Sequence, residues 1–197
     1  MILDTTTGRP EDIQDDHARL AEQDVRLIDV CLSGSSQVIA EGRAVALVGD
    51  RKEQAVYRDI LAAFSKAQYY FGTPGQGNRV KLIVNLVFGL NRLVLAEALG
   101  LAAKGGFDLG LVLELLKEGE TYSVIMDTKG PKMVSGVYEP VVARLAQHLK
   151  DVRLIVEYAK KVGARVPLSE VNARLIQEVV DAGGGQLDNA AVFKAYL

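Results

Sequence analysis

The sequence GTPGQGNRVKLIVN, residues 72–85, places three glycines directly before a long apolar run. Upstream of this stretch, short apolar segments alternate with segments of helical period, a pattern that favours a parallel or mixed sheet. Downstream, every predicted element is a helix. We therefore predict an α/β domain over residues 1–74 and an all-helical domain over residues 75–197, joined by a long helix over residues 77–104.

The expected elements are bounded by glycine, proline and capping residues. Pro10 sits where a helix can begin, and Glu11 and Asp12 follow in its first turn. In the first domain we expect strands at residues 1–4, 25–32, 44–48 and 68–71, with a short helix at 37–42 and an amphipathic helix at 51–65. In the second we expect helices at 77–104, 109–117, 122–129, 140–163, 167–182 and 189–197.

The glycines do not have the spacing of a dinucleotide-binding loop, which is G-x-G-x-x-G between a strand and the first helix of a βαβ unit. Gly72, Gly75 and Gly77 are spaced G-x-x-G-x-G, and more helices follow instead of a second strand. A P-loop is excluded as well, because no Ser or Thr follows Lys81. By its spacing, this stretch is not a phosphate-binding loop.

Lys81 and Asn85 stand out within the apolar run because they are four residues apart, hence on one face of a helix. A lysine that is partly desolvated there has a lowered pKa, since burial disfavours the ammonium form. Such an amine can exchange protons near neutral pH, and an amide one turn away can hold the reacting oxygen. The alternative is a snorkelling lysine with a capping amide, and the spacing alone favours that structural interpretation.

Two further segments place polar residues beside apolar ones. The turn Ser33–Ser36 follows a strand and precedes a short helix, so its N–H groups and hydroxyls suit an anion such as a carboxylate. An ordinary N-cap is the alternative, because Ser is a favoured cap residue. Lys150 and Asp151 lie beside an apolar stripe in residues 148–167, where a solvated helix face explains most of the pattern.

Composition and charge exclude several classes of function. The net charge of −2 comes without a basic patch, so nucleic acid is not an expected partner. A single cysteine, Cys31, fits a reducing cytoplasm, and its apolar segment predicts a buried, inert thiol. Charged and amide residues interrupt the run Val80–Ala103, which favours a buried helix over a membrane span. The spacing of His, Cys and carboxylate residues indicates no metal site.

Taken in order, the three polar segments resemble the β-hydroxyacid dehydrogenase family, which includes 3-hydroxyisobutyrate dehydrogenase and tartronate semialdehyde reductase. The resemblance extends over essentially the whole chain, and the closing residues 185–197 resemble the last helix of the family. The motif D-x-x-x-S-G-[GS] is matched by Asp29, Ser33, Gly34 and Ser35; G-x-x-G-x-G-x-x-x-K-x-x-x-N by Gly72, Gly75, Gly77, Lys81 and Asn85; and K-D-[LV]-x-L-[AI] by Lys150, Asp151, Val152 and Leu154.

The resemblance implies an α/β remnant of a Rossmann-type NAD(P)-binding domain, followed by an all-α domain of the 6-phosphogluconate dehydrogenase type. It also implies reversible hydride transfer between NAD or NADP and a small 3-hydroxy acid, with Lys81 as general acid/base and Asn85 orienting the reacting oxygen. The resemblance therefore favours Lys81 as a proton-exchanging amine over a snorkelling lysine. The implied substrate-binding residues are Ser33, Gly34 and Ser35, and the implied cofactor-side residues are Lys150, Asp151 and Thr6.

The chain departs from the family pattern at its start. The family opens with G-x-G-x-x-G, whereas residues 1–7 resemble a late strand and loop of that domain. We therefore expect the N-terminal dinucleotide-binding portion to be missing, through truncation, a broken reading frame or division of a longer protein, and the isolated chain to bind cofactor weakly or not at all. Ser35 replaces a family glycine. Val84 stands where 6-phosphogluconate dehydrogenases have histidine, which argues against a sugar-acid phosphate substrate.

A function of another class fits the same features: a catalytically inactive fragment that acts as a helical dimerisation module. The run 77–104 is apolar enough for part of it to pack against a second subunit. We expect a homodimer or homotetramer. Binding of NADPH and NAD by this chain would separate the enzyme from the association module.

Overall fold

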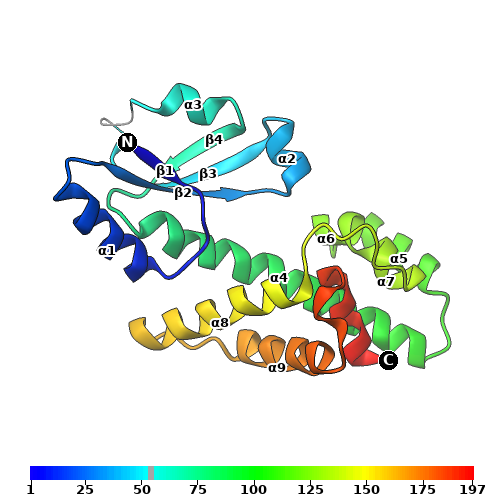
Figure 1. The fold of residues 1–197 in the computed structure, drawn as a ribbon. Coiled ribbons are helices and arrows are strands. Elements are labelled where there is room, and N and C mark those ends of the chain that lie inside the picture. The colour runs from blue at the N-terminus through cyan, green and yellow to red at the C-terminus, as the bar shows by residue number, and fades with distance from the viewer. Residues whose placement is uncertain (53–55) are drawn as a thin grey trace. The chain divides into compact units, whose positions relative to one another are not determined.

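The computed structural model describes residues 1–52 and 56–197 and divides them into two compact units, Met1–Val84 and Asn85–Leu197 (Figure 1). The units meet within one helix, α4 (Gln76–Lys104), so the first unit contains the start of that helix and the second contains the remainder. The domain bounds 1–74 and 75–197 stay a prediction.

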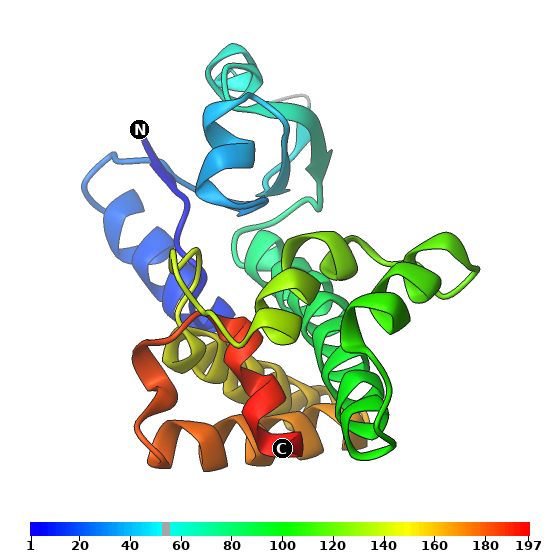
Figure 2. The same cartoon turned by 90° about the vertical axis from the view of Figure 1, so that its right-hand side faces the viewer.

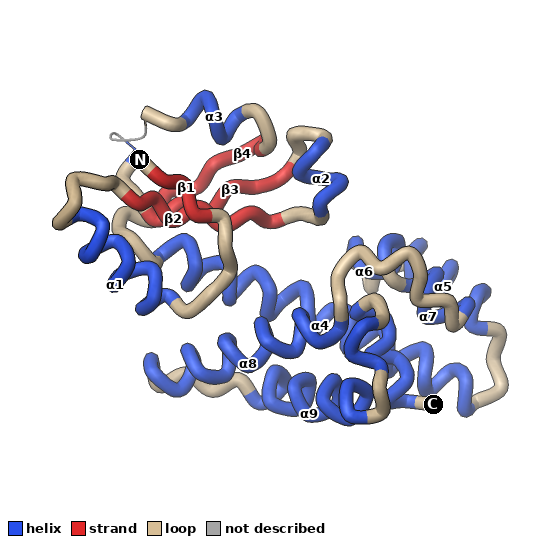
Figure 3. Tube along the Cα trace, viewed as in Figure 1, coloured by secondary structure: helices blue, strands red, loops and turns tan. Residues whose placement is uncertain are grey.

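A four-stranded mixed sheet forms the centre of the first unit (Figure 3). Its strands lie in the order β1 (Ile2–Asp4), β2 (Leu27–Ser33), β3 (Ala44–Gly49) and β4 (Ser65–Tyr70). The pairs β1–β2 and β3–β4 are parallel, whereas β2 and β3 are antiparallel. The α/β class expected for this part of the chain is confirmed.

The inner strands β2 and β3 are apolar at almost every position, as expected of strands covered on both faces. The α-helices among the described residues of this unit before α4 are α1 (Pro10–Ala21), α2 (Ser36–Ala40) and α3 (Arg58–Ala62). Pro10 occupies the start of α1, as the sequence predicts. The buried cluster of this unit consists of Ile28, Val30, Ala46, Val48, Tyr57 and Leu61.

The prediction of an amphipathic helix over residues 51–65 is wrong in the extent of the helix. Of the described residues in this range only α3 is α-helical, and residues 53–55 lie outside the described residues. Tyr57 is fully buried and its hydroxyl donates to Asp50 at 2.6 Å, which anchors the chain just before α3. Ser65 already pairs with Ala44 as the first residue of β4. Pairing with β3 therefore ends the helix early and starts β4 three residues before the expected strand.

The second unit is entirely helical, as predicted, and its helices surround one apolar core (Figures 1 and 2). Leu95, Ala96 and Leu99 bring α4 into this core, and Leu145 and Ile176 bring in the two long helices that follow. The further elements are α5 (Leu109–Glu118), α6 (Val124–Thr128), α7 (Gly130–Ser135), α8 (Leu145–Val162), α9 (Pro167–Asp181), and the 3₁₀ helices η2 (Gly184–Gln186) and η3 (Asn189–Tyr196).

Two details of the second unit differ from the predicted elements. The helix expected from residue 140 begins only at Leu145, because Leu145 N–H donates to Leu187 and Asn189 N–H donates to Ala143. These backbone bonds hold residues 143–145 extended against the chain before η3. The short helix α7 was not expected, and the last helix is a 3₁₀ helix that packs against α7, α8 and α9.

By length and composition, α4 could cross a membrane. The core helix of a water-soluble protein meets the same two criteria, and α4 supplies several fully buried side chains to the core of the second unit. Length and composition are therefore weak grounds for a membrane span.

Candidate functional site

The glycine-rich stretch forms the tight connection between β4 and α4. Gly72 and Gly75 have φ angles of +92° and +85°, in the left-handed region that favours glycine. A Cβ at Gly75 would lie 2.8 Å from the Pro10 carbonyl oxygen, and one at Gly77 would lie 2.5 Å from the Leu47 carbonyl oxygen. The glycines thus allow the first turn of α4 to pack directly on the backbone of Pro10 and Leu47.

A buried carboxylate, Asp29 on β2, receives the start of α4. Its Oδ2 accepts the backbone N–H of Asn78 at 3.1 Å, and its Oδ1 accepts the Asn78 side-chain amide at 2.8 Å. Both residues are fully buried. Burial raises the pKa of Asp29 above its usual value, while the hydrogen bonds from Asn78 oppose that rise. The bonds fix the position of α4 on the sheet.

Lys81 lies one turn after Asn78, half-buried, in the first unit. Its positive charge acts on the thiol of Cys31, which is fully buried on β2 as the sequence predicts. Burial raises the pKa of Cys31 to about 12, helped by the nearby Asp29 and opposed by Lys81. The thiol therefore stays protonated at neutral pH. The lowered pKa expected for Lys81 itself stays a prediction.

The predicted substrate turn follows the end of β2. Ser33 is the last residue of β2 and pairs with Val45 on β3. The Ser35 hydroxyl accepts the N–H of Val38 at 3.3 Å and caps α2, so the structural alternative weighed for this serine is realised. A Cβ at Gly34 would lie 2.8 Å from the Val38 side chain, which explains the glycine. Binding of substrate at this turn stays a prediction.

Thr6 lies in the loop that follows β1. Its N–H and its hydroxyl both donate to Asp4 Oδ1, at 3.0 and 2.6 Å. The Thr6 carbonyl oxygen lies 3.3 Å from Cys31 Sγ, and the next glycine, Gly8, donates its N–H to Asn78 Oδ1 at 2.8 Å. The loop is therefore tied to β2 and to the start of α4.

Three other predicted residues come together in the second unit. The Asn85 side-chain amide donates to Asp151 Oδ2 at 3.2 Å, which links α4 to α8. Lys150 Nζ lies 3.2 Å from Asp151 Oδ1. Asn85 follows Lys81 by one turn of the continuous helix α4, as the spacing predicts. An amide, a carboxylate and an ammonium group therefore meet near this end of α4.

The sequence reasoning gave no role to a buried ion cluster in the second unit. Asp188 accepts Lys129 at 2.7 Å and Lys132 at 3.2 Å, and also the N–H groups of Val142 and Ala190. Burial alone would raise the pKa of Asp188, but Lys129 and the N–H groups of Ala190 and Val142 hold it at about 2. The cluster joins α7, the segment before α8 and η3, so its role is structural. The sequence signal that could have pointed to this cluster is Asp188, an acidic residue within the closing residues 185–197.

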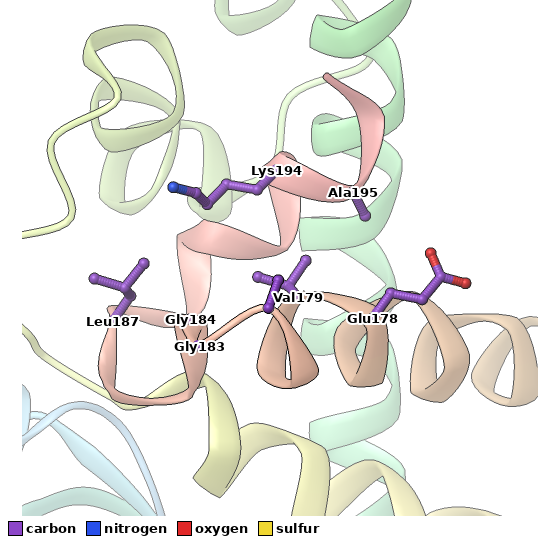
Figure 4. A pocket seen from close by; sticks show the side chains of 8 residues that line it. Glu178, Val179, Gly183, Gly184, Leu187, Lys194 and Ala195 are labelled. Carbon is purple, nitrogen blue, oxygen red and sulfur yellow. The ribbon is translucent and has the colours of Figure 1, made fainter.

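Other polar features of the second unit lie apart from the predicted residues. A hollow of about 430 Å³ opens between the end of α9 and η3, with Glu178 and Lys194 on its wall (Figure 4). None of the predicted site residues lines this hollow. Among residues 1–52 and 56–197, no three His, Cys, Asp or Glu side chains gather to hold a metal ion.

Comparison with known families divides the chain into two matches. Residues 75–196 match the family model described as NAD-binding of NADP-dependent 3-hydroxyisobutyrate dehydrogenase. Residues 1–72 match the model described as the NAD binding domain of 6-phosphogluconate dehydrogenase. Together the two models account for nearly the whole chain.

Individual relatives are distant in sequence but similar in structure. Glyoxylate/succinic semialdehyde reductase 2, chloroplastic, of Arabidopsis thaliana is 28% identical over 169 residues, which cover 85% of this chain and 47% of the relative. L-threonate dehydrogenase of Cupriavidus necator is 27% identical over 180 residues, covering 90% and 60%. A crystal structure of 3-hydroxyisobutyrate dehydrogenase from Salmonella typhimurium superposes with a TM-score of 0.91 at 25% identity, covering 98% of this chain and 68% of that one. The chain thus spans about half to three-fifths of these two curated relatives.

Proposed function

Because the chain belongs to the β-hydroxyacid dehydrogenase family, we propose that its function is NAD(P)-dependent oxidation and reduction of a small 3-hydroxy acid. The bonded pair Asn85–Asp151 carries this proposal. It holds an orienting amide one helical turn from the amine of Lys81, on the same face of α4. An amine and an amide so arranged suit proton exchange with an alcohol or carbonyl oxygen.

A nicotinamide cofactor supplies the hydride acceptor when it is bound. The loop after β1 fits such a group, because Thr6 and Thr7 follow the carboxyl end of a strand that pairs in parallel with β2. Ligands of open α/β sheets bind at that end of the strands. Asp4 accepts two bonds from Thr6 and fixes the turn. We assign Thr6, Lys150 and Asp151 to the cofactor side.

The proposed proton path ends at Lys81. In oxidation, the substrate carbon loses a hydride and its hydroxyl loses a proton, which the neutral Lys81 amine accepts; reduction reverses both steps. Asn85 orients the reacting oxygen, and its bond to Asp151 fixes the plane of the amide. The turn Ser33–Ser35 holds the substrate carboxylate through N–H groups and hydroxyls.

The test is a hydride-transfer assay of this chain, with NAD and NADP added separately and the absorbance of the reduced cofactor followed. L-threonate and 3-hydroxyisobutyrate are the first substrates, because relatives are named for them, and glyoxylate with reduced cofactor tests the reduction of a different substrate, whose product is a 2-hydroxy acid. Turnover that depends on Lys81 supports the proposal. Because this chain alone is expected to bind cofactor weakly or not at all, the deciding assay uses a version that carries an N-terminal dinucleotide-binding portion, and absence of turnover in that version contradicts the proposal.

A second candidate function, a helical association module, is favoured by a row of exposed apolar residues on α4. Val87, Val94 and Leu101 follow one another at seven-residue spacing, and their exposed fractions are 54%, 65% and 77%. This spacing places them along one side of the helix, as in helices that pair with a partner. Under this proposal the chain forms a homodimer or homotetramer without turnover. Sedimentation combined with the assay above separates the two functions.

A further inference from the structure

Asn78 joins three segments that the proposed function uses separately. Its side chain bonds Gly8 in the loop after β1 and Asp29 on β2, and its backbone begins the helix that carries Lys81. Building on the proposed function, we propose that Asn78 is a positioning residue that sets the Lys81 amine against the cofactor loop of residues 4–8. All of these residues belong to the first unit.

The contacts require both halves of the Asn78 amide. Its nitrogen donates to Asp29 Oδ1 at 2.8 Å, and its oxygen accepts the N–H of Gly8 at 2.8 Å. Its backbone N–H donates to Asp29 Oδ2 at 3.1 Å. Asn78 and Asp29 are both fully buried, so water cannot replace a lost partner without cost.

The charge of Lys81 links it electrostatically to the same segments. The Lys81 charge acts on Cys31, and Cys31 Sγ lies 3.3 Å from the Thr6 carbonyl oxygen. The first turn of α4 has no room to move toward β3, because Gly77 already lies against the Leu47 carbonyl. A change at Asn78 therefore moves the loop and the lysine relative to each other.

Reciprocal substitution gives this idea a sharp test. N78D places a second carboxylate against Asp29 and removes the side-chain donor. The double variant D29N/N78D restores the three bonds of residue 78: the carboxylate now at position 78 accepts from Gly8 and from the amide now at position 29, and the oxygen of that amide accepts the backbone N–H of residue 78. A coupling between the two positions is expected whenever they share one hydrogen-bond network. Ser65→Ala is the matched control, because it removes one buried bond of the same unit, to Leu61, away from these segments.

The readout is the rate at which acetic anhydride modifies Lys81, measured by mass spectrometry between pH 6 and 10 relative to the exposed Lys66 of the same unit. We expect N78D to change the relative rate about tenfold, the effect of about one pKa unit at the amine. The double variant returns it to the wild-type profile, and S65A leaves it unchanged. If the chain turns over substrate, kcat falls in N78D more than substrate KM changes, and kcat recovers in the double variant.

The inference is wrong if N78D behaves like S65A, or if the folded double variant keeps the N78D profile. N78S, whose hydroxyl reaches only one partner, takes the place of N78D in these comparisons if N78D does not fold. Circular dichroism reports folding of each variant. The labelling requires no turnover, so absence of turnover in the version with the N-terminal dinucleotide-binding portion counts against the proposed function and leaves the test of Asn78 intact.

Discussion

Lys81 combines a half-buried position with a fixed place in the chain, three residues after the fully buried Asn78. Its charge acts on the Cys31 thiol, which is buried on β2. Asp29 and Asn78 hold this turn of the helix through three hydrogen bonds within the unit. These contacts are what a reacting amine requires: a defined position and partial removal from water.

We expect Lys81→Met to lower turnover by ~10²–10⁴, the usual contribution of a positioned acid or base. Methionine keeps the length and apolar character of the lysine stem, so the fold is expected to persist. The measurement is kcat with either cofactor in a version that carries an N-terminal dinucleotide-binding portion, and Lys66→Met is the control at an exposed position of the same unit. Normal turnover in K81M would remove Lys81 from the mechanism.

His148 is a residue of the second unit whose effect on stability depends on pH. It is buried on α8, and burial lowers its pKa well below the usual value, with Arg92 and Lys129 acting in the same direction. The folded chain therefore keeps His148 neutral, while the unfolded chain binds a proton below pH ~6.5. The stabilisation that comes from keeping His148 neutral is fully present above pH ~6.5 and is lost as the pH falls below it.

We expect the free energy of unfolding to fall by about 1.4 kcal/mol per pH unit below pH ~6.5 on account of His148. His148→Gln removes the titrating group, so the dependence on pH between 6.5 and 5 becomes shallower by about that slope, whatever the stability of the variant at pH 7.5. Urea unfolding at several pH values measures it. An unchanged slope in H148Q would show that other groups account for the acid sensitivity.

At the scale of elements, the start of α4 is the feature on which the first unit depends. The helix begins against β3 so closely that a side chain at residue 77 has no space. Gly72 and Gly75 supply the left-handed turns that bring the chain there from β4. In the second unit, Asp188 plays a comparable role, because its carboxylate joins α7 to η3 through Lys129 and Lys132.

Gly77→Ala is expected to destabilise the first unit although alanine is the better helix former. The added Cβ would meet the Leu47 carbonyl oxygen at 2.5 Å and the Asp29 carboxyl carbon at 3.1 Å, and neither backbone nor buried carboxylate yields easily. We expect a loss of about 1–3 kcal/mol, as for other overpacked sites. Urea unfolding is the measurement. Gly8→Ala, whose Cβ would meet nothing within 4 Å, is the control, and equal losses in the two variants would contradict the packing argument.

At the scale of the whole molecule, the chain combines an α/β unit with a helical unit, and each of two family models matches one part of it. The row Val87, Val94 and Leu101 on α4 is exposed, while the side chains that alternate with it enter the core of the second unit. Exposed apolar rows of this kind mark interaction surfaces. Under the proposal of a helical association module, this row is the surface at which two chains would pair.

Val94→Glu is expected to shift the chain from oligomer toward monomer, because it would bury a carboxylate without a partner at the centre of the row. Sedimentation velocity across a range of concentrations measures the change. Leu168→Glu is the control, since Leu168 on α9 is similarly exposed, at 64% against 65% for Val94, but lies outside the row. An identical oligomer distribution in wild type and V94E would exclude this side of α4 as the interface.

The sequence by itself determined the class of both parts, because alternating apolar segments and helical periods follow directly from how strands and helices bury one face. It also placed Lys81 and Asn85 on one helix face, a consequence of 3.6 residues per turn. It placed Pro10 at the start of α1, and its motifs identified the family. Local chemistry suffices for all of these results except the family, which rests on the resemblance of its motifs.

Tertiary structure alone decided the remaining features. Pairing of β4 with β3 and burial of Tyr57 confine α3 to Arg58–Ala62 within the expected 51–65 helix, and backbone bonds between residues 143–145 and 187–189 delay α8. The bonds of Asn78 to Gly8 and Asp29 cross 70 and 49 residues of sequence. Such partners leave no periodic signal, since their contact energy depends on distant segments meeting in space rather than on the residues beside them.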